Sequence, residues 1–117
     1  MALSRRLMRS GALRHIITIE QPPTTADGSG GVTGSWTAFD ADVPAAVEPV
    51  SGSEQFRADQ VQFRRTHRVT VRHNASKLPT TAMRINFGGR LLYIVAILNP
   101  DELNVWLELH VEERAHD

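Results

Sequence analysis

The chain contains no cysteine, only one lysine, and no excess of charge of either sign. Without cysteine it can form no disulfide scaffold, no cysteine-ligated zinc finger and no thiol nucleophile. Thirteen basic residues balance thirteen acidic ones and the sequence pI is near 7.0, which argues against a free-standing nucleic-acid binder of the usual cationic kind. The longest apolar run, residues 91–98, is too short to cross a bilayer, so no membrane partner is expected.

The length of the chain and its share of apolar and charged residues indicate one folded domain. The chain has 117 residues, of which 41% are apolar and 22% charged, as in ordinary single-domain proteins. Its basic first residues are not followed by an apolar segment or a small-residue cleavage site, so no signal peptide is expected. We therefore expect a soluble, intracellular protein with a basic arm over residues 1–14, one domain over residues 15–113 and a tail over residues 114–117.

Alternation of apolar and polar residues predicts a chain built of short strands. It is strictest at the carboxyl end, where Val105, Leu107 and Leu109 alternate with larger or polar side chains. The nearly continuous apolar run that begins at Arg90 predicts a strand buried on both faces, with Phe87 and Tyr93 in the core. The predicted strands cover residues 15–21, 35–50, 68–73, 83–87, 90–99 and 104–112.

The connections between these strands contain turn-forming residues. Gly88-Gly89 predicts a tight hairpin, because glycine tolerates the positive φ that such turns need. Residues 24–34 are rich in glycine and predict an exposed, mobile loop, and Pro44 predicts an edge or a bulge. A capping box that begins at Ser51 favours a short helix over residues 53–62. The fold is therefore predicted to be all-β, a six-stranded antiparallel β-barrel or sandwich with one short helix or long loop between the second and third strands.

Candidate catalytic and metal-binding groups are sparse. His67 and His73 would share a strand face about 20 Å apart, too far for one ion whose ligands lie about 2 Å from it. Asp40 and Asp42 would share a face about 7 Å apart, a spacing usable in glycoside hydrolysis, but no polar partner set accompanies them, so a small hydrolase is the weakest hypothesis. Residues 28–34 lack the third glycine of a dinucleotide-binding loop. No catalytic residue, metal or cofactor is expected.

Arginine is the most distinctive residue type, since the chain has twelve arginines and a single lysine. Five of them fall between positions 57 and 72, and guanidinium suits phosphates and carboxylates alike. An OB-like single-stranded nucleic-acid-binding protein stays open as an alternative, although it needs aromatic platforms and only 6% of the residues are aromatic. Contacts between arginines and carboxylates across a protein interface agree better with the zero net charge.

The order of several segments carries a resemblance to one family. These segments are residues 10–22, the glycine-rich stretch that leads to Trp36, and residues 46–54, 66–72, 87–93 and 98–109. In this order they resemble the phage head–tail joining family, also called head closure, head completion or stopper proteins. The resemblance implies a structural virion protein without catalytic activity, a small β-barrel that forms a ring, usually a dodecamer, in the virion neck. A gene transfer agent or a prophage particle would use the same part, assembled in the host cytoplasm.

The resemblance also implies partners and sites. The partners would be other copies of the chain, a portal or adaptor protein, tail terminator or tail proteins and, transiently, packaged double-stranded DNA. Because a channel that releases DNA should not bind it tightly, we expect the arginines to face carboxylates of neighbouring proteins. The expected interface residues are Arg5, Arg6, Arg9, Arg14, Asp27, Arg64 and Arg65. The expected channel loop holds Ser51, Gly52, Ser53, Glu54, Gln55, Phe56 and Arg57.

Overall fold

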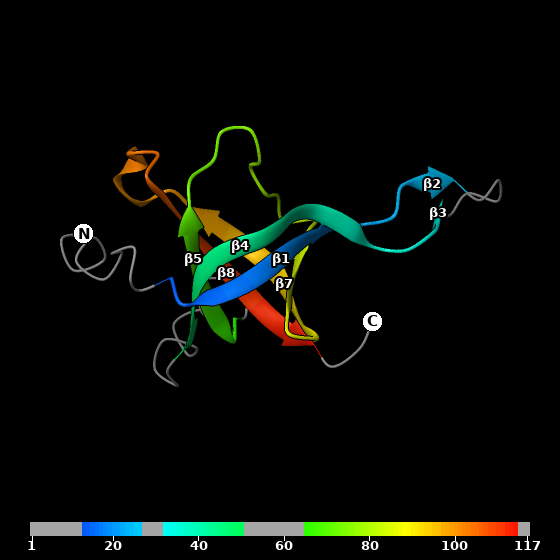
Figure 1. Ribbon diagram of the computed structural model, residues 1–117, viewed down its shortest axis with the longest axis horizontal. Helices are drawn as coiled ribbons and strands as arrows, with labels where there is room; N and C mark the ends of the chain where they lie inside the picture. The colour runs from blue at the N-terminus through cyan, green and yellow to red at the C-terminus, as the bar shows by residue number, and fades with distance from the viewer. Residues whose placement is uncertain (1–12, 27–31, 51–64, 115–117) are drawn as a thin grey trace.

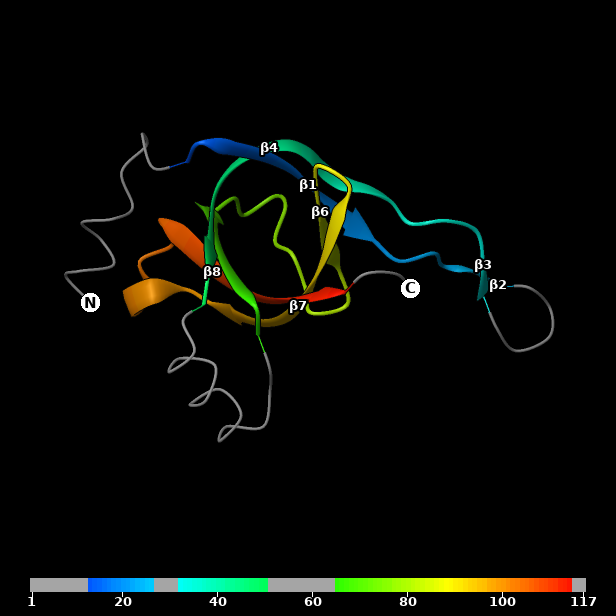
Figure 2. The same cartoon turned by 90° about the horizontal axis from the view of Figure 1, so that it is seen from below.

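A computed structural model of the chain describes residues 13–26, 32–50 and 65–114. Six antiparallel strands close into a barrel in the order β1-β4-β5-β8-β7-β6, so that β6 also pairs with β1 (Figures 1 and 2). The predicted all-β, six-stranded antiparallel barrel is therefore confirmed, and the helix or long loop predicted after residue 50 lies outside the described residues. The barrel strands are β1 (His15–Gln21), β4 (Thr37–Pro49), β5 (His67–Arg72), β6 (Arg84–Phe87), β7 (Arg90–Leu98) and β8 (Trp106–Arg114).

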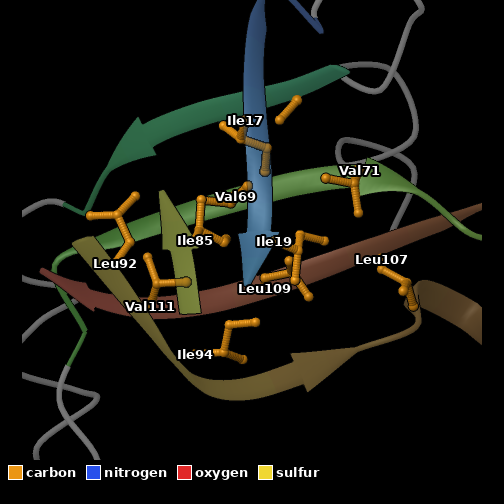
Figure 3. Packing of buried hydrophobic residues seen from close by; sticks show 11 residues of the cluster. Ile17, Ile19, Val69, Val71, Ile85, Leu92, Ile94, Leu107, Leu109 and Val111 are labelled. Atoms are coloured by element: carbon orange, nitrogen blue, oxygen red, sulfur yellow. The ribbon is translucent and has the colours of Figure 1, made fainter. Parts of the chain in front are cut away.

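The core fills the barrel from all six strands. On β8 the alternation seen in the sequence puts Leu107, Leu109 and Val111 inside, where they lie opposite β5 residues such as Val69 and Val71. Each fully buried aliphatic side chain contributes about 1.5–3 kcal/mol, so the strands are held mainly by this shared interior (Figure 3). The core cluster consists of Ile17, Ile19, Ala45, Val69, Val71, Ile85, Leu92, Ile94, Leu107, Leu109 and Val111.

The β6–β7 hairpin turns at the two glycines, as predicted. Gly88 and Gly89 have φ of +60° and +94°, and Phe87 pairs with Arg90 across the turn. The backbone N–H of Gly89 donates to Asn86 Oδ1 at 2.8 Å. Positive φ at both central residues matches the right-handed twist of the flanking strands, which explains why two glycines stand here.

Strand β7 is buried on one face only, so the prediction of two buried faces is wrong. Leu92 and Ile94 lie inside, whereas Tyr93 points outward and contacts Arg84 and Arg114. The prediction from the apolar run failed because Tyr93 is amphipathic. Guanidinium groups cover its ring on the outer wall, and its hydroxyl accepts a hydrogen bond there. Phe87, the other aromatic assigned to the core, packs against it as predicted.

The segment after β1 contains a short ribbon where the sequence predicted only a loop. Strand β2 (Thr25–Ala26) pairs with β3 (Val32–Thr33), and the ribbon extends away from the barrel (Figures 1 and 2). Pro44 fits its strand because β5 pairs with β4 only from Ala45 onward, so the missing N–H of Pro44 removes no ladder bond on that side. Pro44 itself pairs in register with Ile16, and a bulge lies beside it in the same strand, where the β1–β4 register shifts between Ile17 and Ile19.

Candidate functional site

Two of the seven predicted interface residues lie in the described part of the chain. Arg14 is exposed immediately before β1, and Arg65 is half-buried shortly before β5. Arg14 is the last residue of the predicted amino-terminal arm, and Arg65 follows the connection after β4 that holds the predicted channel loop. Outside the described residues lie Arg5, Arg6, Arg9, Asp27, Arg64 and the whole predicted channel loop, Ser51, Gly52, Ser53, Glu54, Gln55, Phe56 and Arg57.

Arg65 is anchored on the outer wall of the barrel by a buried histidine. Its Nη1 contacts Nδ1 of His110, while Nε2 of His110 lies 2.9 Å from Glu108 Oε1. Because arginine only donates, this pair of contacts assigns His110 the tautomer with its hydrogen on Nε2. The hydrogen bond from His110 lowers the pKa of the Glu108 carboxyl, against the opposing effect of burial. The chain that enters β5 is thereby fixed to β8.

Among the described residues, four ion pairs on the outer wall join an arginine to a glutamate of the same chain. The sequence led us to expect the arginines to face carboxylates of neighbouring proteins, which stays a prediction; at four positions the subunit itself already supplies a carboxylate partner. The charge of these guanidinium groups is therefore already balanced before any assembly. The pairs are Arg68–Glu48 at 3.4 Å, Arg84–Glu20 at 2.7 Å, Arg90–Glu113 at 2.9 Å and Arg114–Glu112 at 3.0 Å.

The root of the β2–β3 ribbon is fixed to the barrel through Arg84. The guanidinium of Arg84 donates to Glu20 Oε1 at 2.7 Å and to the Tyr93 hydroxyl at 2.9 Å. Trp36, which stands between the ribbon and β4, covers the same guanidinium at 4.2 Å and meets the Tyr93 ring edge-on at 5.9 Å. Arg84 is itself buried. The ribbon therefore leaves the barrel from a rigid base, which neither the composition nor the spacing of these residues signals.

A second charged cluster marks the end of the barrel at which β4 finishes and β5 begins. Arg90 binds Glu113 through Nε and Nη2, each at 2.9 Å, and its Nη2 lies 3.3 Å from Nε2 of His67. The hydrogen bond to Arg90 lowers the pKa of Glu113. Burial, followed by the charge of Arg90, lowers the pKa of His67. His67 pairs with Pro49, so the cluster flanks the connection that was predicted to face the channel.

Residues 13–26, 32–50 and 65–114 show no arrangement of side chains that supports the enzymatic or the metal-binding alternative. No group of three metal-ligating side chains occurs in these ranges, nor do they contain a helix long and apolar enough to cross a membrane. Asp40 and Asp42 line a shallow cavity of about 210 Å³ together with Arg72. Asp42 has a φ of +56°, and this irregularity interrupts the regular strand on which the 7 Å spacing of the two carboxylates was based.

The geometry defines a small closed barrel with a ribbon rooted through Arg84 and a wall on which four arginines pair with glutamates. A family model described as phage head completion protein matches residues 8–114, so the chain belongs to the phage head completion protein family. The resemblance stated from the sequence is therefore confirmed. The chain is a structural protein of a phage-type virion.

The solved structures similar to this chain include two that cover most of its length. One is a protein of Shigella flexneri 2a, known from a solution structure, with a TM-score of 0.72 and 27% identity over 94% of this chain and 100% of that chain. The other is a chain in the virion of a native gene transfer agent particle, with a TM-score of 0.65 and 26% identity over 88% of this chain and 96% of that chain. No curated protein matches the sequence.

Proposed function

We propose that this protein is a head–tail connector subunit, of the head closure or stopper kind, whose copies form a ring in the virion neck. The ring, a dodecamer by the resemblance to the family, would lie between the portal or adaptor and the tail and offer the docking surface for the tail. The observation that carries this proposal is the family match over nearly the whole chain, supported by the similarity to a chain of a gene transfer agent virion.

The architecture suits a ring subunit. Barrel closure pairs most of the strand edges, so contacts with neighbours fall mainly to the segments that project from the barrel and to the part of β4 before Ala45, which β5 does not pair. The β2–β3 ribbon has two residues per strand, too few for a hairpin to be stable alone in water, and a neighbouring protein would stabilise it. The ribbon lies at the opposite end of the long axis from the start of β1 (Figures 1 and 2). Two different surfaces of this kind are what head-to-tail contacts require.

The paired arginines fit a protein that lies beside DNA and releases it. Each phosphate that a basic group neutralises adds salt-dependent affinity, and the four arginine–glutamate pairs remove such groups from the described wall. We infer that the ring retains packaged DNA through the connection over residues 51–64, which would act as a steric stop, and that the barrel wall contributes little affinity.

Cryo-electron microscopy of purified particles, with and without this chain, tests the proposal. We expect a ring of barrels between portal and tail in complete particles, and tailless heads that lose DNA when the gene is deleted. Density for the barrel in the capsid shell or along the tail tube, or normal tailed particles after deletion, would contradict the connector role.

Single-stranded nucleic-acid binding is the competing function, and the aromatic side chains disfavour it. Arginines cover the rings of Trp36, Tyr93, Phe87 and Trp106 at 4.2–5.3 Å, so bases would have to displace them before stacking. We expect the purified protein to bind oligonucleotides only weakly at physiological salt. Tight binding that falls steeply as salt rises would favour the OB-like alternative.

A further inference from the structure

The connection between β7 and β8 presents an apolar surface. Leu98, Leu103 and Val105 are 50%, 50% and 48% exposed, although they lie within eight residues of sequence. We call these three side chains the β7–β8 patch. Scattered single apolar residues on a surface are ordinary, whereas apolar side chains gathered on one short segment are typical of an interaction surface.

The patch is held in shape by hydrogen bonds of its own loop. Asn99 Nδ2 donates to Asn104 Oδ1 at 2.7 Å, and the backbone N–H of Asn104 donates to Asn99 Oδ1 at 3.2 Å. The loop contains the 3₁₀ turn η2 (Pro100–Glu102), and Glu102 has a φ of +53°. A non-glycine residue adopts this region only at a cost in free energy. A short loop that tolerates this cost and stays bonded across its base presents its apolar groups in a fixed arrangement.

The charged residues within this loop are acidic, and Arg72 beside it lies over the ring of Trp106. Asp101 and Glu102 are exposed, and residues 98–105 include no basic residue. The amino-terminal arm has the complementary composition: residues 1–14 carry four arginines and no acid, with Leu3, Leu7 and Met8 among them. Apolar groups interspersed with arginines suit an apolar surface bordered by carboxylates.

We propose that the amino-terminal arm of one copy docks on the β7–β8 patch of a second copy. The patch residues keep about half of their surface exposed within the single chain and so leave room for an occupant, and the self-assembly put forward above supplies a second copy. The start of β1 and the β7–β8 connection lie at the same end of the long axis (Figures 1 and 2). Twelve extended residues span at most about 40 Å, enough to reach a neighbour. The proposal rests on the self-assembly put forward under the proposed function.

The absence of cysteine in the chain allows a clean cross-linking test. Full-length Leu7→Cys and Leu103→Cys chains, each with one thiol, are mixed at concentrations that span self-assembly and oxidised. A disulfide between the two variants then joins different copies by construction. Leu78→Cys is the matched control partner, because Leu78 is 47% exposed in another connection. Circular dichroism of each variant verifies folding, and sedimentation velocity reports assembly in the same samples.

We expect the Leu7→Cys and Leu103→Cys chains to cross-link at least about tenfold more than the Leu7→Cys and Leu78→Cys chains, because docking raises the effective concentration of the two thiols. Adding Glu102→Lys to the Leu103→Cys chain should lower the yield several-fold. If both mixtures gave equal disulfide yields in samples that sediment as oligomers, the docking of the arm would be overturned while the proposed function would stand. Chains that stay monomeric at every concentration and are missing from particle necks would overturn the proposed function as well.

Discussion

The guanidinium carbon of Arg84 lies 4.2 Å from the centroid of the Trp36 ring. This contact joins two segments that are far apart in sequence, the exit from the β2–β3 ribbon and strand β6. Beneath the ring, Arg84 also binds Glu20 of β1 at 2.7 Å. One buried cation therefore connects the ribbon to two barrel strands, and the rigidity of the ribbon base depends on it.

Replacing Arg84 by alanine should destabilise the protein strongly. The side chains of Arg84 and Glu20 are only 11% and 15% exposed, and removing one partner of a buried pair leaves an uncompensated charge, at a cost of about 3 kcal/mol. Chemical denaturation gives the change in the free energy of unfolding. Arg90→Ala is the control, since its pair with Glu113 is 46% and 33% exposed and is worth less than about 1 kcal/mol. Equal losses for the two variants would show that Arg84 is not a buried anchor.

Trp36→Leu should loosen the ribbon more than the barrel. The variant loses the edge-on contact with Tyr93 and the contact with Arg84, together about 1–2 kcal/mol. Amide hydrogen exchange should accelerate at the ribbon root, around Thr37, while β8 amides such as that of Leu109 keep their protection. Uniform acceleration in both regions would indicate a global loss of stability instead.

Glu108→Gln should reduce the sensitivity of the fold to acid. The pKa of Glu108 is lowered in the folded state, so its contribution to stability is complete above the unfolded value of 4.5 and is lost as the pH falls through the folded value. The variant should lose about 1 kcal/mol near neutral pH, because the charge-assisted bond from His110 becomes neutral. Its unfolding free energy should then decline less than that of the native chain below about pH 4.5. Urea titrations at several pH values measure this free energy. If it declined equally for the variant and the native chain as the pH falls, the role of Glu108 would be contradicted.

Gly88 and Gly89 should respond differently to substitution. A Cβ at either position meets no atom within 4 Å, so any cost comes from the backbone alone. Gly88→Asn should be nearly neutral, because asparagine accepts a φ near +60° and Asn-Gly is a preferred hairpin turn. Gly89→Ala should cost about 1–2 kcal/mol at a φ of +94°. Thermal unfolding of the two variants measures the difference, and similar losses would contradict the turn geometry.

Local pattern determined the strands and the turn between β6 and β7. The alternation at Leu107 and Leu109 needs only a two-residue period and one buried face, both of which are properties of neighbouring residues. The Gly88-Gly89 turn is equally local, because the demand for positive φ arises within two residues. The family resemblance, carried by the order of such segments, was also contained in the sequence.

Only the tertiary structure decided which strands close the barrel and which charges meet. Pairing of β1 with β6, which closes the barrel, joins residues more than sixty positions apart, and no local period encodes that distance. The outward position of Tyr93 followed from the guanidinium groups that cover it, and the partner of Arg84 followed from the closure that brings Glu20 beside it. A charged side chain is satisfied by whichever opposite charge the fold brings near, so its partner is a property of the packed chain as a whole.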